Sequence, residues 1–281
     1  MRTATVGEML DVSRKRLAPV SETAGLDGQV LLAKVMGKEK TWILAHPEAV
    51  LSDIEREKLE QGLSRLAAGE PLAYVLGEWE FFGLKLKVSP TVLIPRPETE
   101  LLVETAINWL SLNPGLRKAL DVGTGSGCIP VAIAHNIDDV HFVATDISPD
   151  AIEIAQQNVA RYELGQRISL VETYLTRGVR GNFDLITANL PYIPDERLPS
   201  LAVSKWEPRL ALGGGPDGLR FIEPFLRQAE AKLSKHGIVL AEIDASLEGA
   251  VINLANSLFP QAEIEVRKDL AGLPRLLVVQ I

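Results

Sequence analysis

The sequence predicts an α/β fold, in which helices cover both faces of a mostly parallel sheet, preceded by a small helical domain. Three observations support this prediction. From residue 97 onward, helical and strand patterns alternate regularly, which is typical of such sheets. A glycine-rich turn at 121–127 follows the first strand of this series, and Asn-Leu-Pro-Tyr at 189–192 follows the fourth. Open α/β sheets bind ligands at the carboxyl ends of their strands, so we expect both motifs at one site.

The first 75 residues carry helical patterns. Ser52 followed by Glu55 is a capping box, and it opens a helix whose apolar residues recur at helical spacing until Gly69. No residue of this region carries visible chemistry. We therefore expect residues 1–75 to form a helical domain that contacts a substrate or a partner.

Residues 76–96 change in character. Two short alternating runs flank Gly83, which indicates a β-hairpin. Pro90, Pro95 and Pro97 stiffen the stretch that follows, because proline fixes its own backbone angle. We expect this hairpin linker to join the helical domain to a catalytic domain at 97–281.

The catalytic domain is predicted element by element from its periodicity. We expect helices at 98–110, 127–136, 150–162, 219–233 and 246–258. We expect strands at 118–122, 140–145, 168–172, 183–188 and 237–243, with 262–266 and 275–280 pairing as a closing hairpin.

Composition narrows the class of protein. The net charge of −8 argues against a protein that grips nucleic-acid phosphates. Cys128 is the single cysteine, so no internal disulfide is possible, as is usual in a reducing compartment. The N-terminus lacks the apolar core of a signal peptide, and no apolar run is long enough to span a membrane. We expect a cytoplasmic protein without membrane contact.

The turn at 121–127 reads Asp-Val-Gly-Thr-Gly-Ser-Gly. The dinucleotide fingerprint would need glycine at position 128, where this chain has Cys128. The spacing instead matches S-adenosylmethionine-dependent methyltransferases, and glycines there let the backbone approach a ligand closely. We expect cofactor contacts from the whole loop: Gly123, Thr124, Gly125, Ser126 and Gly127.

Asp146 stands at the end of the next predicted strand. A carboxylate there can accept hydrogen bonds from both ribose hydroxyls of an adenosyl group. The alternative is that Asp146 caps the following helix, a function that Ser148 can share.

The tetrapeptide Asn189-Leu190-Pro191-Tyr192 places an amide, free carbonyls and an aromatic ring at a strand end. A planar amino group has two N–H donors, and such a cluster offers two acceptors and a ring face. The alternative is a simple turn, in which proline ends the strand and tyrosine packs.

Together these motifs resemble the HemK/PrmC family, protein-(glutamine-N5) methyltransferases that modify peptide chain release factors. The resemblance spans nearly the whole chain. It includes Ile-Pro-Arg-Pro-Glu-Thr-Glu at 94–100, the glycine loop, the tetrapeptide, and Glu-Pro with Gly-Gly-Gly-Pro-Asp-Gly-Leu between 207 and 219. It implies a seven-stranded, Rossmann-like class I methyltransferase domain behind an N-terminal helical domain.

The resemblance also implies the chemistry. The methyl donor is S-adenosylmethionine, which becomes S-adenosylhomocysteine. None of the four histidines has the spacing of a metal pair, so we expect no metal. The implied acceptor is the glutamine of the release factors' Gly-Gly-Gln loop. Tyr174 matches a family aromatic near the adenosyl group, and Asn189 contacts both cofactor and substrate. Two positions depart from the family pattern: Thr173 stands where aspartate is frequent, and Leu190 where proline is usual.

We expect catalysis by placement. Asn189 and the Leu190 carbonyl would each accept one N–H of the substrate amide, while Tyr192 stacks on its plane. Four alternatives remain open. The substrate could be a glutamine of a ribosomal protein or an exocyclic nitrogen of adenine or guanine in nucleic acid. The chain could instead be a non-catalytic adenosyl-binding protein or, least favoured, an NAD-dependent dehydrogenase.

Overall fold

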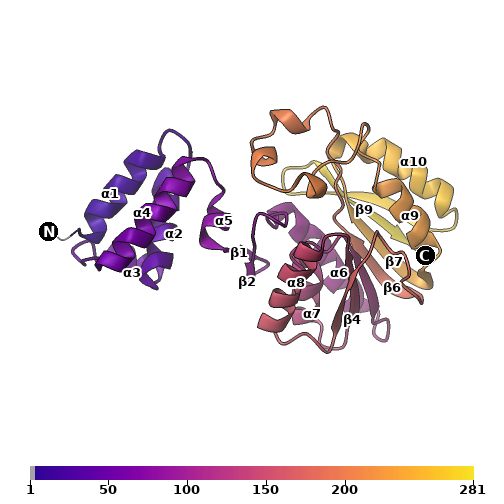
Figure 1. The fold of residues 1–281 in the computed structure, drawn as a ribbon. Coiled ribbons are helices and arrows are strands. Elements are labelled where there is room, and N and C mark those ends of the chain that lie inside the picture. The colour runs from indigo at the N-terminus through magenta and orange to yellow at the C-terminus, as the bar shows by residue number, and fades with distance from the viewer. Residues whose placement is uncertain (1–3) are drawn as a thin grey trace. The chain divides into compact units, whose positions relative to one another are not determined.

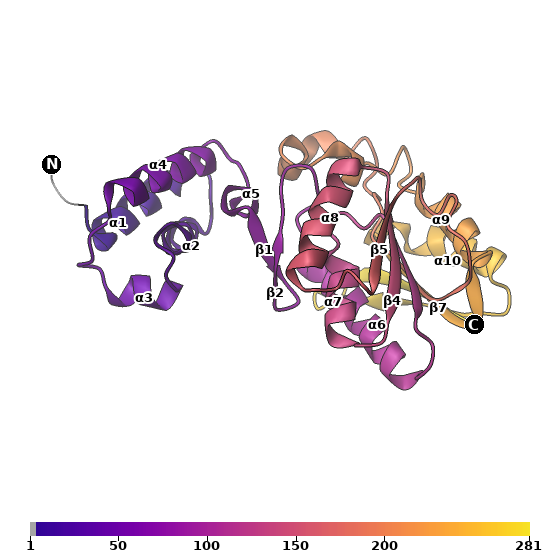
Figure 2. The same ribbon diagram turned by 60° about the horizontal axis from the view of Figure 1, so that its bottom comes forward.

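The computed structural model describes residues 4–281. The chain divides into two compact units, Met1–Glu78 and Trp79–Ile281. Each unit has its own apolar core, and Figures 1 and 2 show the elements of each. Within residues 4–281, no helix is both long and apolar enough to cross a membrane.

The first unit is helical in its described part. Ser52 caps a helix by accepting the Glu55 backbone N–H, while the Glu55 side chain accepts the Ser52 N–H, so the predicted capping box is confirmed. Leucines and other aliphatic side chains on the facing sides of the helices form the core. The helices are α1 (Val6–Leu17), α2 (Ala24–Met36), α3 (Lys40–Ala45), α4 (Asp53–Ala67) and α5 (Leu72–Leu76).

The second unit contains a seven-stranded sheet in the order β5-β4-β3-β6-β7-β9-β8, and β1 pairs separately with β2. Within residues 4–281, β9 alone runs opposite to the other six strands of this sheet, so the predicted fold class is confirmed. The strands are β1 (Glu78–Phe81), β2 (Leu84–Lys87), β3 (Lys118–Val122), β4 (His141–Asp146), β5 (Ile168–Glu172), β6 (Phe183–Ala188), β7 (Leu233–Glu242), β8 (Glu263–Lys268) and β9 (Pro274–Gln280). The α-helices are α6 (Glu100–Leu112), α7 (Cys128–Asn136), α8 (Pro149–Arg161), α9 (Ile222–Glu230) and α10 (Glu248–Leu258).

Two apolar clusters sandwich this sheet. Because successive side chains of a strand point to opposite faces, Ala119 packs on one side and Leu120 on the other. The first cluster lies under α6, α7 and α8 and includes the hairpin residues Phe81, Leu84 and Leu86. The second lies under α9 and α10. Figure 1 shows these two groups of helices on opposite faces of the sheet.

The register of the central strands brings the predicted motifs together. Val122 at the end of β3 pairs with Thr145 of β4 on one side and with Ala188 of β6 on the other. Ala188 in turn pairs with Ala241 of β7. The residues that follow these four strands therefore emerge side by side at one edge of the sheet.

Two predicted boundaries were wrong. The helix expected at 219–233 covers only Ile222–Glu230, and the strand expected at 237–243 begins at Leu233. Leu233 pairs with Phe183, and an irregularity in the ladder then absorbs the residues before Ile238. Gly237 lies at this irregularity, inside the strand. In the sequence alone, a glycine before an apolar run indicates the start of a strand, which explains the wrong boundary.

Candidate active site

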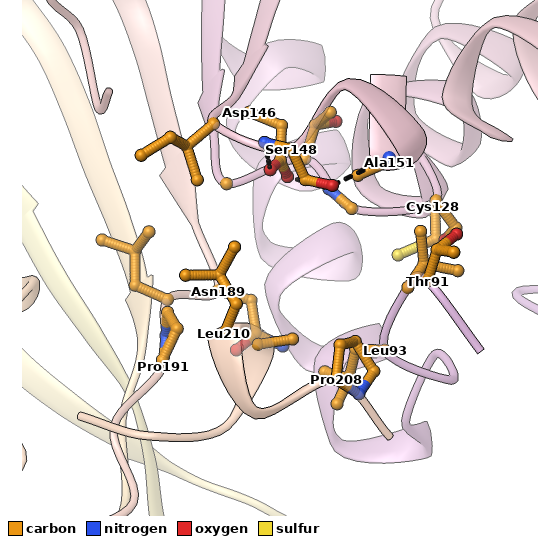
Figure 3. A pocket seen from close by; sticks show the side chains of 18 of the residues that line it. Thr91, Leu93, Cys128, Asp146, Ser148, Ala151, Asn189, Pro191, Pro208 and Leu210 are labelled. Atoms are coloured by element: carbon orange, nitrogen blue, oxygen red, sulfur yellow. Dashed lines mark hydrogen bonds between the residues drawn. The ribbon is translucent and has the colours of Figure 1, made fainter. Parts of the chain in front are cut away.

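A cavity of about 370 Å³ opens at the carboxyl edge of the sheet. This size is in the range of small-molecule sites. Its lining comes from the turn after β3, the ends of β4 and β6, the connector at 90–96, and the long loop after β6. Figure 3 shows Asp146 and Asn189 from the sheet edge around the same space as Leu93 and Pro208 from the two connecting segments.

The glycine turn closely approaches the tip of β6. Gly123 has φ +74°, a conformation that favours glycine, and a Cβ added there would lie 2.8 Å from Leu190 Cδ2. Gly123 and Leu190 therefore pack against each other, and the turn and the tetrapeptide form one surface. The glycine turn and the tetrapeptide therefore lie together and border the same cavity.

A buried asparagine that sequence reasoning missed supports this turn. Asn158 of α8 donates to the Ser126 carbonyl at 2.8 Å and to the Lys87 carbonyl at 3.0 Å, and its Oδ1 accepts the Lys87 N–H at 2.7 Å. It therefore ties the glycine turn to β2. Its only sequence signal is a polar residue on the apolar face of a predicted helix.

The turn carries polar groups without partners. Asp121 Oδ2, Thr124 Oγ1 and Ser126 Oγ are buried and have no hydrogen-bond partner of regular geometry among residues 4–281, although Thr124 lies close enough to Asp121 to oppose the rise in pKa that burial causes there. Thr124 and Ser126 line the cavity, and Asp121 lies beneath them with no exposed surface. Buried polar groups are rarely left unpaired, so the turn is suited to a ligand that supplies hydrogen-bond partners.

Asp146 lines the cavity at the end of β4. Its Oδ2 accepts the Gly125 N–H at 2.8 Å and its Oδ1 accepts the Ser148 N–H at 3.0 Å. Each carboxylate oxygen can accept a further hydrogen bond. Burial raises the pKa of Asp146, and the two backbone donors act in the opposite direction. Helix α8 is capped by Ser148, which accepts the Ala151 N–H, so Asp146 is not needed as the cap.

Asn189, Leu190 and Pro191 line the cavity from the tip of β6. Asn189 Nδ2 donates to Thr99 Oγ1 at 3.1 Å. The same three residues also border an adjoining cavity of about 260 Å³. The amide of Asn189 is thus held on one side only, and its Oδ1 can accept a hydrogen bond from a ligand.

Tyr192 lines only the adjoining cavity, and its hydroxyl donates to Glu242 Oε1 at 3.0 Å. Glu242 is 3% exposed and also accepts the Thr99 hydroxyl at Oε2, at 2.6 Å. Burial raises the pKa of Glu242, while the bonds from Thr99 and Tyr192 favour its ionised form. Burial beside Glu242 likewise raises the pKa of Tyr192, so its phenol stays protonated.

The other predicted contacts are placed as follows. Tyr174 lines the cavity and is 40% exposed, with its ring 6.5 Å from that of Phe221, a lining residue that the sequence did not suggest. Gly127 does not line the cavity. It precedes α7 and lies against Ala155 of α8, where an added Cβ would meet the Ala155 Cβ at 3.2 Å.

Two segments that sequence analysis treated as connector and loop form one wall of the cavity. Glu207, almost fully buried, accepts a charge-assisted hydrogen bond from Arg96 and the Ile94 N–H at 3.3 Å. It thereby ties the proline-rich connector to the loop after β6, whose Pro208 and Leu210 also line the cavity. Among residues 4–281, no group of three or more His, Cys, Asp or Glu side chains is arranged to hold a metal ion.

Replacement of Asp121 by asparagine should change how stability depends on pH. Burial raises the pKa of Asp121 to about 6, above its ordinary value of 3.8, although Thr187 donates to it. Because the folded state then binds the proton more tightly, the wild-type protein loses stability as pH rises from about 4 to about 6. Relative to Asp121→Asn, the loss should reach about 3 kcal/mol, and urea unfolding across this range measures it. If the free energy of unfolding depends on pH in the same way for both proteins, burial does not raise the pKa of Asp121.

The chain was compared with protein families and with individual relatives. Residues 8–77 match the model of the PrmC N-terminal domain, and residues 98–204 match that of the methyltransferase small domain. The release factor glutamine methyltransferase of Coxiella burnetii is 38% identical, over 95% of this chain and 95% of that protein. The protein of the same name from Bradyrhizobium diazoefficiens is 34% identical, over 96% and 94%.

Solved structures agree on the fold. A ribosomal protein L11 methylase from Lactobacillus delbrueckii subsp. bulgaricus superposes with a TM-score of 0.51 at 22% identity, covering 69% of this chain and 84% of that one. The family assignment rests on sequence identity to the two relatives named above over nearly the whole chain. The distant structural similarity to the methylase supports the fold alone. The chain belongs to the family of release factor glutamine methyltransferases.

Proposed function

We propose that this chain transfers a methyl group from S-adenosylmethionine to the side-chain nitrogen N5 of the glutamine in the Gly-Gly-Gln loop of peptide chain release factors. The observation that carries the proposal is Asn189, which lines the cavity together with the glycine turn and whose Nδ2 is bonded to Thr99, so that its Oδ1 is left to accept a hydrogen bond. The names of the relatives support release factors as the substrate.

The cavity fits S-adenosylmethionine in size and in chemistry. Thr124 and Ser126 of the glycine turn line the cavity and suit the charged methionine end, and Asp146 has free acceptor positions for the two ribose hydroxyls. Tyr174 and Phe221 offer ring faces to the adenine. We assign Gly123, Thr124, Gly125, Ser126, Asp146 and Tyr174 to the cofactor. Gly127 supports it indirectly, by bringing α7 against α8.

The chain's own contribution to the reaction is placement. When bound, S-adenosylmethionine supplies an electrophilic methyl group on a sulfonium sulfur. The glutamine amide nitrogen is a poor nucleophile because its lone pair is delocalised into the carbonyl. Asn189 Oδ1 and the Leu190 carbonyl each accept one N–H, and so they fix the plane of the amide and the direction of its nitrogen. Such alignment is worth up to about 7–11 kcal/mol of barrier in favourable cases.

The same groups also stabilise the charge that develops. As the nitrogen becomes positive, the two acceptor oxygens are already aimed at its hydrogens. The ring of Tyr192 is the part of that side chain left for the substrate, because the hydroxyl is bonded to Glu242. A ring face near a cation is worth about 0.5–2 kcal/mol. The N-protonated amide is a strong acid and gives its proton to water.

The departures from the family pattern fit this proposal. Leu190 presents the same carbonyl oxygen that a proline would, and its side chain fills the space beneath Gly123. Thr173 is held by its own bonds, from its N–H to the Asp146 carbonyl and from its hydroxyl to the Arg177 carbonyl. We assign residues 1–75 to substrate contact, residues 76–96 to the linker, and residues 97–281 to catalysis.

A competition assay tests the substrate class. Labelled S-adenosylmethionine is incubated with the protein and equal amounts of purified release factor, ribosomal proteins and adenine-containing nucleic acid. We expect label in the release factor alone. Label chiefly in a ribosomal protein or in nucleic acid would replace the proposed substrate by one of the alternatives. Absence of label in all of them would contradict the assignment as an active enzyme.

A further inference from the structure

Behind Asn189 lies a buried chain of hydrogen bonds for which the mechanism has not accounted. Asn189 Nδ2 donates to Thr99 Oγ1 at 3.1 Å, and the Thr99 hydroxyl donates to Glu242 Oε2 at 2.6 Å. Thr99 is 2% exposed and Glu242 is 3% exposed. These residues come from the start of α6, the tip of β6 and the tip of β7, which are far apart in the sequence.

When Glu242 is ionised, the form that its bonds from Thr99 and Tyr192 favour, counting protons along this chain gives each bond a direction. An ionised carboxylate can only accept, and a hydroxyl has a single proton. Thr99 gives that proton to Glu242, so toward Asn189 its oxygen can only accept. The NH₂ group of Asn189 must then face Thr99, and its Oδ1 must face the other way. The orientation of an asparagine amide is assigned from its hydrogen bonds, and with Glu242 ionised this network favours the NH₂ group facing Thr99.

The opposite orientation would disable the site. If the Asn189 amide turned over, its Oδ1 would meet the lone pairs of Thr99. Its NH₂ group would then meet the N–H groups of the substrate amide, donor against donor. Both contacts are unfavourable, and the pair of acceptors that holds the glutamine nitrogen would be lost.

We infer that Thr99 and Glu242 are positioning residues that orient the Asn189 amide with its oxygen toward the substrate. The inference rests on the proposed function, because it gives Asn189 its purpose. Glu242 also holds the Tyr192 hydroxyl, so a single carboxylate orients both side chains at the tip of β6. Glu242 does not line the cavity, and Thr99 lines it with only 2% of its surface exposed, so we assign both residues to positioning and not to substrate contact.

Kinetics of Thr99 variants test the inference. Thr99→Val keeps the shape of the side chain but removes the acceptor for Asn189, and kcat should fall by about 10–100-fold. The affinity for S-adenosylmethionine and the substrate KM should both stay within about threefold of wild type. Thr99→Ser restores the hydroxyl and should recover kcat. Wild-type kcat in Thr99→Val would overturn the inference.

A matched control separates positioning from stability. Thr105 on α6 is 4% exposed and its hydroxyl accepts only a long bond from Arg267, at 3.4 Å. Thr105→Val makes the same chemical change outside the network, so it should leave kcat unchanged. If Thr105→Val and Thr99→Val lower kcat equally, Thr99 acts through general packing and the inference fails.

A double-mutant cycle asks whether Thr99 acts through Asn189. With stoichiometric enzyme and long incubation, the slow methylation by Asn189→Ala should be no slower in Asn189→Ala/Thr99→Val. Additive losses would mean that Thr99 acts by another route, which contradicts the inference. Glu242→Gln is isosteric and should also lower kcat, because its amide can donate to Thr99 and release the hydroxyl to turn toward Asn189 Oδ1.

One measurement does not depend on activity. In ¹⁵N–¹H spectra the Asn189 side-chain NH₂ should exchange at least about tenfold more slowly in wild type than in Thr99→Val, because a buried acceptor protects it. Equal exchange rates would overturn the network even if the enzyme is active. If the wild-type protein shows slow exchange but does not methylate release factors, the proposed function is wrong. The inferred orientation of Asn189 is then still supported.

Discussion

Asn189→Ala should lower the rate of methyl transfer by about 10²–10³-fold, the usual effect of removing one preorganised hydrogen-bonding group from an active site. The substitution removes the oxygen that accepts one N–H of the glutamine amide. The Leu190 carbonyl remains, but a single acceptor does not fix the plane of the amide. The glycine turn and Asp146 are untouched, so the affinity for S-adenosylmethionine should stay within about threefold of wild type.

Single-turnover methylation and calorimetry with S-adenosylmethionine measure the two halves of this prediction. Asn136→Ala is a suitable control, because the Asn136 side chain bonds only to the Ala132 carbonyl of its own helix. It should leave both quantities unchanged. Unchanged turnover in Asn189→Ala would remove Asn189 from the reaction. A parallel loss of cofactor affinity would make it a cofactor ligand first.

Asp146→Ala should weaken S-adenosylmethionine binding by about 10²–10⁴-fold. Hydrogen bonds to a charged acceptor are worth about 1.5–3 kcal/mol each, and we assign two ribose hydroxyls to this carboxylate. The substitution also frees the Gly125 N–H, which Asp146 holds at 2.8 Å. The glycine turn then loses an anchor as well as the ligand contact.

Calorimetry at one pH and salt concentration checks this effect. Glu153→Ala removes an exposed carboxylate from α8, next to Gln157 and outside the cavity lining, so its affinity should equal that of wild type. If Asp146→Ala binds S-adenosylmethionine as tightly as Glu153→Ala does, Asp146 contributes nothing to the cofactor site.

The sequence predicted the fold and the meeting of three motifs at one edge of the sheet because both depend on local signals. Apolar runs and helical periodicity marked the sheet and its helices, and the fold follows from their alternation. The glycine turn, Asp146 and Asn189 each follow a predicted strand, so the rule for open sheets was sufficient to group them. The structure confirms that they border one cavity.

Sequence analysis did not identify Thr99 and Glu242 as functional residues, because no local sequence pattern distinguishes them. Thr99 lies in the first turn of the helix predicted at 98–110, where a threonine is unremarkable, and Glu242 is one acid at the end of an apolar run. Only the register of β6 and β7, with Ala188 opposite Ala241, places Glu242 near Asn189. A carboxylate directly after a buried strand was the available signal, and Asp146 was found by the same reasoning.

Sequence analysis also did not predict which segments form the cavity walls, for a different reason. Arg96 and Glu207 are 111 positions apart, and no pattern within either segment indicates that they pair. Pro208 and Leu210 read as parts of a surface loop. Their placement against the sheet edge results from tertiary packing, which periodicity does not describe.

Tandem mass spectrometry of a release factor after reaction with this protein and S-adenosylmethionine tests the central claim most directly. The account predicts one added methyl group, located on the side-chain nitrogen of the Gly-Gly-Gln glutamine, and no product from a release factor with glutamate at that position. A methyl group on any other residue, or equal methylation of the glutamate variant, would contradict the claim that Asn189 and Leu190 hold a glutamine amide.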